Sequence, residues 1–391
     1  MKAFATLFAP AAALFASQFA FAVPPAPQPP SQPPAATVRV AAADEWKVLN
    51  NEALALYRKG DLDGAQAFAQ KAVDAAARTL PPGDPGRAIA DTSLGVILRG
   101  QGKLAEAEAP LGRALAIREK SLGADHADTG ASLNTLASLY DAERKYSAAE
   151  PLYLRALAIR EKKLGPDHPD VAVVLNNLAA AYSAEHKLAE AEPLYVRALA
   201  IREKALPPEH ADIATSLNNL AALYRAEEKY ALAEPLYARS LAIREKTLGP
   251  THPDVATGLN NLATLYDAQA RYLEAEPLYK RALAIREKDF GPDHPETATS
   301  LNNLGELYST QRNYDKAEPL LLRALAIRER SLPLGDPDVV KTLTNLSSLY
   351  TAKGQFALAE QYQPSGELGL SEQQKRRLLI PLPTAGRGAA K

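Results

Sequence analysis

Five of the six histidines stand at one constant spacing, which raises the question of a metal site. They occupy positions 126, 168, 210, 252 and 294, each 42 residues after the last. A zinc site needs three or four ligands about 2 Å from one ion, whereas a helix layer of roughly 10 Å separates successive histidines of this series. The spacing therefore excludes a shared metal. Each histidine precedes a proline or alanine at a predicted helix start, so we expect it to cap a helix end.

The other residues that could take part in catalysis form no recognisable catalytic motif. The 391 residues include no cysteine, which excludes a thiolate zinc site, an iron–sulfur cluster and a cysteine nucleophile. Gly100-Gln101-Gly102-Lys103 lacks the preceding strand and the full spacing of a phosphate loop. No nucleophile–base pair or paired-carboxylate cleft is apparent, and a net charge of -1 lacks the cationic surplus that nucleic acid requires. We expect no enzyme, metal, cofactor, nucleic acid or small-molecule substrate.

The same step of 42 residues runs through most of the chain. Tyrosines keep it at 140, 182, 224, 266, 308 and 350, and arginines at 118, 160, 202, 244, 286 and 328. A period of 20–50 residues is typical of solenoids and propellers. Counted without insertions, the units are 43–84, 85–126, 127–168, 169–210, 211–252, 253–294 and 295–336, with an eighth that begins at 337 and loses its second half.

Unit 253–294 predicts two helices. Residues 253–268 place Leu259, Leu262 and Tyr266 on one face at helical spacing, and residues 272–288 do the same with Ala275, Tyr279 and Ala282. A polar turn at 269–271 joins them, and glycine and proline mark the unit boundary. One such pair leaves an apolar face exposed, so each pair needs its neighbours.

These motifs resemble a known family. The spacing of the residues just named is similar to the tetratricopeptide repeat, and the longer unit, with Leu-Asn-Asn-Leu-Ala and Ala-Glu-Pro-Leu-Tyr, resembles the kinesin light chain type. The resemblance covers about residues 43–363. It implies an all-α, right-handed α-solenoid with a concave groove that binds peptides. The heptad helix by which kinesin light chains join a motor has no counterpart here, so we do not expect a motor-adaptor function.

Repeated asparagines are the candidate site. Asn261 lies opposite the buried side of its helix, and the resemblance implies that this side lines the groove; Asn51, Asn177, Asn219, Asn303 and Asn345 are its equivalents, with Thr215, Thr257 and Thr299 as companions. Asparagine is unfavourable inside helices, and its amide can donate to and accept from a peptide backbone. The alternative is a structural ladder of amides between helices. We expect the adjacent set to be structural: Asn134, Asn176, Asn218, Asn260 and Asn302.

Two further repeated features are expected to be structural. Arg-Glu-Lys runs such as 286–288 end each second helix, and their alternating charges favour a solvated surface with weak ion pairs. Prolines inside each second helix should only bend it slightly: Pro151, Pro193, Pro235, Pro277 and Pro319.

The two ends of the chain predict export and a short cap. Residues 1–22 have one lysine, an apolar stretch and an Ala-Phe-Ala ending, which is typical of a signal peptide cleaved after Ala22, with an uncleaved anchor as the alternative. Residues 23–43 form a proline-rich spacer, and the repeats occupy 44–363. The tail 364–391 is basic, and 371–380 could form a helix that caps the array.

Together these patterns predict an exported scaffold, periplasmic or extracellular, without a stable membrane span after cleavage. Its partner would be a protein or a peptide segment in the concave groove. The alternative function is that of a structural subunit of an envelope assembly that docks through the convex face or the ends of the array.

Overall fold

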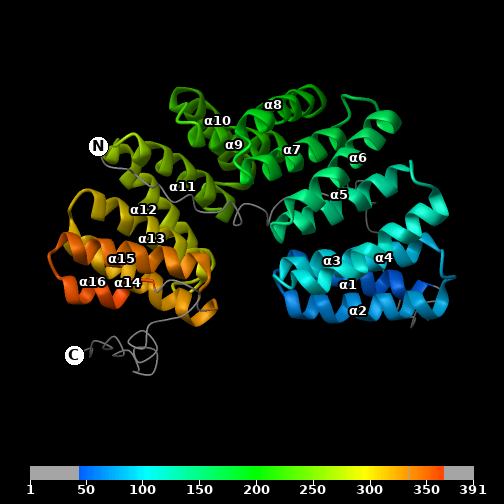
Figure 1. Cartoon of the computed structure of the whole chain (residues 1–391), viewed down its shortest axis with the longest axis horizontal. Coiled ribbons are helices and arrows are strands. Elements are labelled where there is room, and N and C mark those ends of the chain that lie inside the picture. Colours follow the sequence, from blue (N-terminus) through cyan, green and yellow to red (C-terminus); the bar gives the residue numbers. More distant parts are fainter. Residues whose placement is uncertain (1–43, 334, 365–391) are drawn as a thin grey trace, which may run out of the picture. The chain divides into compact units, whose positions relative to one another are not determined.

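The computed structural model describes residues 44–333 and 335–364, and every regular element in this range is a helix (Figure 1). The predicted signal peptide, the spacer and the tail beyond residue 364 lie outside the described residues. The described chain falls into two compact units, which divide between Pro207 and Pro208.

Sixteen helices make up the described residues. The first unit contains α1 (Glu45–Arg58), α2 (Leu62–Thr79), α3 (Pro85–Gly100), α4 (Leu104–Leu122), α5 (Ala127–Ala142), α6 (Tyr146–Leu164), α7 (Pro169–Ala184) and α8 (Leu188–Ala205). The second contains α9 (Ala211–Ala226), α10 (Tyr230–Leu248), α11 (Pro253–Ala268), α12 (Tyr272–Asp289), α13 (Pro295–Thr310), α14 (Tyr314–Ser331), α15 (Pro337–Ala352) and α16 (Phe356–Tyr362).

The helices are arranged in successive antiparallel pairs, as the period predicts. Helix α11 has the predicted bounds, and α12 is one residue longer than expected. Seven pairs are complete, while the eighth ends with α16, which has only seven residues. The prediction of a helical solenoid with seven full units and a truncated eighth is therefore confirmed.

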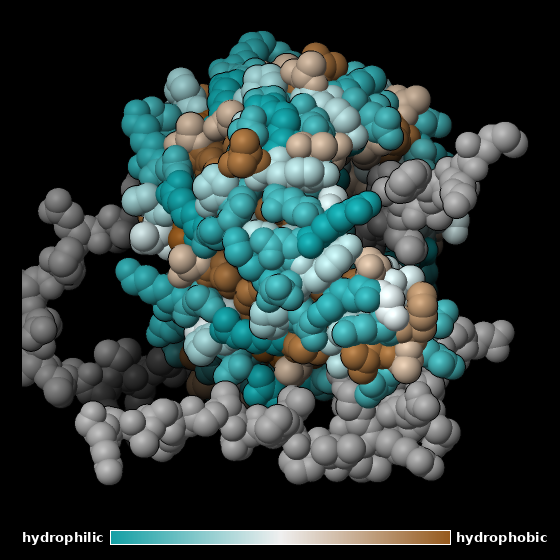
Figure 2. All heavy atoms as spheres, turned by 90° about the vertical axis from the view of Figure 1, so that its left-hand side faces the viewer, coloured by the Kyte–Doolittle hydropathy of each residue, from teal (hydrophilic) through white to brown (hydrophobic). Residues whose placement is uncertain are grey.

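Alanine at fixed positions lets the helices of a pair come close together. Ala263 on α11 and Ala275 on α12 are fully buried, and Tyr279 fills the space beside them with 2% of its surface exposed. Outward-facing positions are polar, so the face seen in Figure 2 is mostly hydrophilic, with hydrophobic residues interspersed. Within the described residues, no helix has the length and apolar character needed to cross a membrane.

The repeated histidines cap the first helices of five pairs, as predicted. His252 Nδ1 accepts a hydrogen bond from the backbone N–H of Asp254 at 3.1 Å, and His294 Nδ1 accepts one from Glu296 at 3.2 Å. The same bond occurs at His126, His168 and His210. Asp84 and Asp336 take this role where the series lacks histidine. Each cap satisfies one of the N–H groups that a helix start leaves unpaired.

A left-handed residue closes the turn within most pairs. Ala270 and Arg312 have φ values of +57° and +58°. Gly102 and Gly354 occupy the same point of their turns with φ values of +75° and +73°. Since a side chain is unfavourable in this region, the non-glycine turns carry local strain.

In five pairs, a hydrogen bond from tyrosine to glutamate joins the pair to the one before it. Tyr308 Oη donates to Glu276 Oε1 at 2.8 Å, and Tyr350 Oη donates to Glu318 Oε1 at 2.9 Å. The same bond occurs at Tyr140, Tyr182 and Tyr266. This contact explains why the Ala-Glu-Pro motif and the repeated tyrosine keep one phase. The prolines of this motif sit inside continuous helices, with Pro277 six residues into α12.

One core position departs from the repeat. Asp91 on α3 stands 42 residues before Leu133, where the other first helices have leucine, and only 4% of it is exposed. Arg113 on α4 donates to its Oδ1 from Nη2 at 2.5 Å and from Nε at 3.2 Å. Burial raises the pKa of Asp91, although Arg113 opposes this effect. The core of this pair therefore contains an ion pair in place of a leucine.

Candidate functional site

The candidate asparagines lie on the first helices of successive pairs and bond to one another. Asn261 Nδ2 on α11 donates to Asn218 Oδ1 on α9 at 2.7 Å. Asn303 Nδ2 on α13 donates to Asn260 Oδ1 on α11 at 3.1 Å. The corresponding bonds join Asn345 to Asn302 and, in the first unit, Asn177 to Asn134. We call the surface formed by Asn261, Asn303, Asn345 and their companions Thr257 and Thr299 the asparagine face.

This ladder confirms that the adjacent asparagines are structural. Asn218 and Asn302 are buried and accept their bonds from the next helix pair. Asn261 and Asn303 are only half-buried. Each donates one N–H to the asparagine of the preceding pair, and we call this hydrogen bond a rung of the ladder. Their Oδ1 atoms and second N–H groups form no further hydrogen bond within the described residues. Contact of these groups with a ligand stays a prediction. Asn177 and Asn219 are more buried, with 8% exposed.

The threonines of the face contact a row of buried arginines. Arg286 Nη2 donates to Thr257 Oγ1 at 3.4 Å, and Arg328 Nη2 donates to Thr299 Oγ1 at 3.3 Å. Thr215 donates to the carbonyl of Ala211 at 3.1 Å. Two of the three predicted threonines are therefore held by side chains that come from the second helices.

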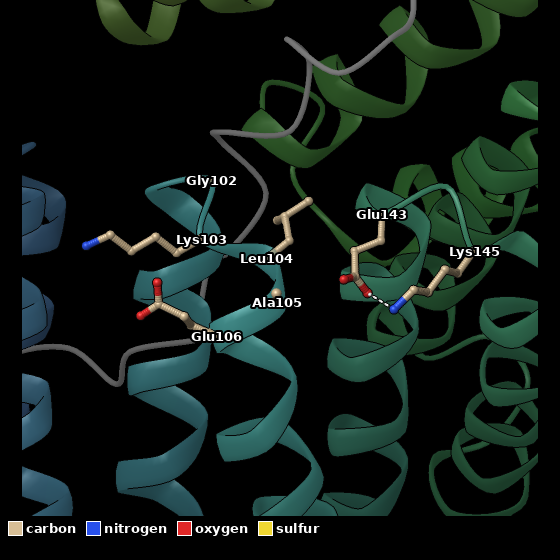
Figure 3. A pocket seen from close by; sticks show the side chains of 7 residues that line it. All are labelled: Gly102, Lys103, Leu104, Ala105, Glu106, Glu143 and Lys145. Carbon is tan, nitrogen blue, oxygen red and sulfur yellow. Dashed lines mark ion pairs between the residues drawn. The ribbon is translucent and has the colours of Figure 1, made fainter. Parts of the chain in front are cut away.

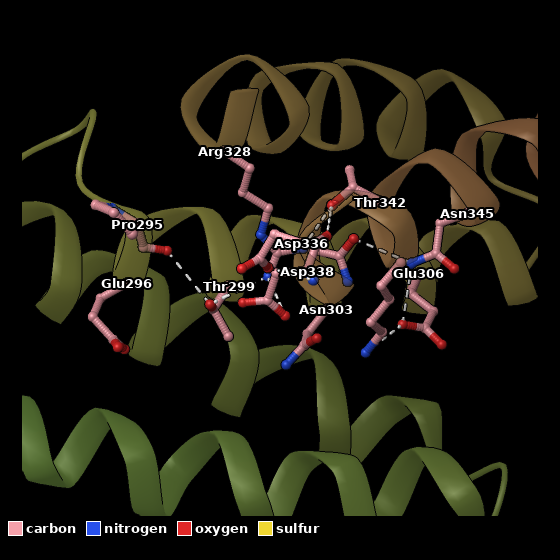
Figure 4. A network of polar contacts seen from close by, with 12 residues as sticks. Pro295, Glu296, Thr299, Asn303, Glu306, Arg328, Asp336, Asp338, Thr342 and Asn345 are labelled. Atoms are coloured by element: carbon pink, nitrogen blue, oxygen red, sulfur yellow. Dashed lines mark hydrogen bonds and ion pairs between the residues drawn. The ribbon is translucent and has the colours of Figure 1, made fainter. Parts of the chain in front are cut away.

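These arginines correct the sequence-based expectation of a solvated surface. Arg286 and Arg328 are 4% and 2% exposed. Arg328 Nη1 donates to Thr342 Oγ1 at 2.6 Å and to the Asp338 carbonyl at 2.9 Å, so its guanidinium joins two helix pairs (Figure 4). Burial lowers the pKa of Arg328 from its ordinary value, and the Asp338 carboxylate opposes that effect. The exact recurrence of arginine every 42 residues was the signal of a buried role, because solvated positions need no fixed residue.

Carboxylates that sequence reasoning missed lie beside the asparagine face. Asp267 follows Asn260 by seven residues, about two turns, so both lie on the side of α11 that faces α13. Glu306 follows Asn303 by three residues on α13. Glu306 Oε2 accepts from Asn345 Nδ2 at 3.3 Å and pairs with Lys341 at 3.4 Å. Figure 4 shows Glu306 and Asn345 directed toward each other.

The carboxyl group of Asp267 is less acidic than that of an ordinary aspartate. Burial raises its pKa to about 6, the Glu306 carboxylate adds to this rise, and Lys341 opposes it. No hydrogen bond or ion pair to the Asp267 carboxylate occurs within the described residues. At neutral pH this carboxylate is therefore charged, half-buried and without a directly bonded cation.

The first unit repeats this arrangement three pairs earlier. Asp141 stands 126 residues before Asp267, and burial raises its pKa to about 6 as well. Here the Arg99 guanidinium opposes the rise, while Glu185 adds to it. Behind each aspartate lies a buried tyrosine, Tyr153 or Tyr279, whose pKa burial raises. A charged residue at one repeat position, two turns after an asparagine, could have revealed both sites.

The family model for the tetratricopeptide repeat matches residues 47–120, 87–162, 142–204, 212–288 and 268–330, which together span more than half of the sequence. The chain belongs to the tetratricopeptide repeat family. None of the curated proteins matches the chain closely enough to count as a relative.

The chain is also similar to several solved structures. BtubC (BKLC) from P. vanneervenii is 27% identical with a TM-score of 0.51, over 58% of this chain and 91% of that one. The quorum sensor NprR from B. thuringiensis, in its apo form, has a TM-score of 0.62 at 13% identity, over 83% and 87% of the two chains, and shows the fold alone. A kinesin light chain-like protein with nearly identical TPR-like repeats from Podosopora anserina is 31% identical with a TM-score of 0.46, over 52% and 97%.

Outside the asparagine face, the first unit has a shallow hollow. One open depression of about 460 Å³ lies between the turn at Gly102 and Lys103 and the ion pair of Glu143 with Lys145, which are 3.1 Å apart (Figure 3). It includes the glycine–lysine turn, whose sequence lacks the full spacing of a phosphate loop. The structure has this turn between two helices, as expected. No group of three or more potential ligands for a metal ion occurs among the described residues.

Proposed function

We propose that this protein is a non-enzymatic scaffold that holds an extended peptide segment or partner protein along the asparagine face. The observation that carries the proposal is the half-buried amide of Asn261, repeated at Asn303, which keeps an acceptor and a donor after forming its rung. A peptide backbone offers the complementary donor and acceptor at every residue. Each hydrogen bond would contribute roughly 0.5–1.5 kcal/mol, so a series of repeats could supply useful affinity.

A matched pair of double variants tests this proposal. Asn261→Ala with Asn303→Ala removes two rungs and the two outward amides. Asn218→Ala with Asn260→Ala removes the same two rungs from the accepting side and leaves the outward amides in place. The probe is a peptide selected from a displayed random library on the purified wild-type protein, with binding measured by calorimetry.

We expect the first variant to weaken binding at least about tenfold, because four possible hydrogen bonds to the peptide are lost. The second should bind within about threefold of wild type. If peptide binding weakens equally in both variants, the asparagines act only as a structural ladder and do not contact the peptide. Circular dichroism checks that both variants keep their helicity.

Export forms part of the same proposal and rests on the sequence of residues 1–22. The mature protein would begin after Ala22 and work in the periplasm or outside the cell. Fractionation followed by amino-terminal sequencing tests it. Recovery of the intact chain of 41.9 kDa from the cytosol would contradict export.

A second candidate function is that of an assembly subunit that docks through the end of the array. Phe356 on the shortened α16 is 69% exposed and Leu358 is 38% exposed, which favours a contact at that end. A partner held there would not be released by a peptide that competes for the asparagine face. Release by that peptide would exclude this candidate.

A further inference from the structure

On α11 and α13, the outward asparagines are the residues of the asparagine face that keep unused hydrogen-bonding groups. The Thr299 hydroxyl donates to a carbonyl of its own helix at 3.4 Å (Figure 4) and accepts from a buried arginine, and Thr257 is bonded in the same way. By contrast, Asn261 and Asn303 each form one rung and no other hydrogen bond with the described residues. Each of these pairs therefore offers one hydrogen-bonding point to a ligand.

Helix α15 supplies a third point of this kind. Asn345 Nδ2 donates to Asn302 Oδ1 at 3.2 Å and to Glu306 Oε2 at 3.3 Å, while its Oδ1 accepts no hydrogen bond from other described residues. Glu306 also pairs with Lys341 at 3.4 Å, so the two charges beside Asn345 offset each other. The three points suit an uncharged group with both a donor and an acceptor, which is what a peptide backbone supplies.

The rungs limit the distance between these points. Asn303 Nδ2 lies 3.1 Å from Oδ1 of Asn260, the neighbour of Asn261. Two asparagine side chains joined in this way span at most about 11 Å between their α-carbons. Packed helices have axes about 8–10 Å apart. One outward asparagine therefore follows the last at about 10 Å.

This step selects among the conformations of a bound peptide. An α-helix has its backbone groups bonded internally and leaves none for the amides. A strand presents the same side every second residue, at about 6.6–6.8 Å, so a step of about 10 Å meets its opposite side. A polyproline II helix has about 3 residues per turn and rises about 9.3 Å in that turn, with its backbone groups free. Only this last conformation repeats in step with the array.

We propose that the partner segment lies on the asparagine face of the second unit as a polyproline II helix, with every third residue opposite one asparagine. This inference rests on the proposed function and names the conformation of its ligand. The residue opposite each asparagine must keep its N–H, so it is not proline. The two residues between such contacts can both be proline, which fixes φ close to the required value.

Repeating Ala-Pro-Pro peptides with blocked ends test this register by calorimetry on the full chain. Alanine in place of glycine prevents a collagen triple helix. We expect the affinity to rise about tenfold with each added triplet, because each triplet brings further hydrogen bonds. The rise should stop at about three triplets, one for each of Asn261, Asn303 and Asn345.

A peptide of the same length and composition with its alanines adjacent is the matched probe. It keeps only one N–H in register and should bind at least about tenfold more weakly. Equal binding of the two peptides would overturn the proposal, and so would the absence of binding by the repeating peptide at its highest soluble concentration.

A double-mutant cycle assigns one contact. Changing the middle alanine of the three-triplet peptide to proline removes one N–H, and Asn303→Ala removes the acceptor. Each change alone should weaken binding about tenfold, and both together about as much as Asn303→Ala alone. Asn260→Ala is the control, because it removes the same rung and keeps the outward amide, and it should bind within about threefold of wild type. Additive losses would show that the middle residue does not contact Asn303, which contradicts the register.

The library-selected peptide separates this inference from the proposed function. N-methylation of each of its residues in turn removes one N–H at a time and should weaken binding at every third residue. Sensitivity at every second residue would show that the peptide lies as a strand. In that case the proposal is wrong, but the scaffold function stands as long as binding depends on Asn261 and Asn303. Binding that does not depend on these asparagines would contradict the proposed function itself.

Discussion

Asn261 shows how one side chain can hold an array together and still face outward. Its amide donates one N–H to Asn218, while its oxygen and second N–H form no hydrogen bond with other residues that the structure describes. The helix tolerates this unfavourable residue because the rung satisfies part of the amide. The buried arginines act similarly, since Arg328 is bonded to two helix pairs while Thr299 above it stays half-buried. Residues that stabilise the fold therefore also position the candidate site.

Asp141 provides a prediction on pH dependence. Its pKa rises from 3.8 in the unfolded chain to about 6 in the folded protein. The folded state then binds this proton more tightly, so the contribution of Asp141 to stability is largest below about pH 4 and is lost as the pH rises through 6. We expect Asp141→Asn to stabilise the protein by about 2 kcal/mol at pH 7.5, a value reduced for partial exposure, and by almost nothing at pH 3.5.

Urea unfolding at several pH values measures this difference. Glu52→Gln, at an exposed position on α1, is the control and should change little at any pH. A stabilisation that does not depend on pH would show that the aspartate acts through its shape and not its charge.

At the scale of the element, helix pairs differ at a few positions within one common plan. The plan consists of a capping histidine, a left-handed turn residue and a tyrosine–glutamate contact. Ala270 follows this plan with a left-handed turn residue that is not glycine, and Asp91 replaces the core leucine of the other first helices. Each of these two positions predicts a stabilising substitution.

The turn between α11 and α12 should accept glycine. Ala270 has a φ of +57°, where a β-carbon costs about 1 kcal/mol. Ala270→Gly should therefore raise the free energy of unfolding by up to about 1 kcal/mol, after the entropy that glycine adds to the unfolded chain. Thermal unfolding measures it. Ala268→Gly, in the last position of α11, is the control and should lower stability.

The ion pair in the core of α3 and α4 should be replaceable. Asp91→Leu restores the residue of the other first helices, and half-exposed Arg113 can turn to solvent. Exchange of a buried ion pair for an apolar residue often stabilises by about 1–4 kcal/mol. Asp91→Asn, which keeps a buried polar group without the charge, should destabilise. Chemical denaturation compares the two, and a loss of stability with leucine would contradict the argument.

At the scale of the whole molecule, the period determines nearly everything that sequence alone could predict. The 42-residue step placed the bounds of α11 and α12 and the histidine caps, because local patterns set helix starts and ends. The recurrence of arginine at the position of Arg286 signalled a buried role, but the side chains that surround Arg286 and those that shift the pKa of Asp267 could not be predicted, since they come from neighbouring pairs.

Because each helix pair mainly contacts its neighbours, we expect the effect of a destabilising core substitution to stay local. Leu301 on α13 is fully buried, and Leu301→Ala should cost about 2–5 kcal/mol. In a chain of nearest-neighbour contacts, its effect should reach the adjacent pairs first. We expect faster amide exchange in α11–α16 and little change in α1–α4, as measured by mass spectrometry. Uniform acceleration across the chain would indicate global cooperativity.

Because the repeats are nearly identical, helices could also pair wrongly during folding. A second helix that packs against the wrong first helix would contact a leucine at the same position. The carboxylate of Asp91 does not remove that ambiguity, because every later second helix has an arginine at the position of Arg113: Arg155, Arg197, Arg239, Arg281 and Arg323. Any of these helices could supply the cation that Asp91 needs. Asp91→Leu should therefore leave the population of misassembled intermediates during refolding unchanged.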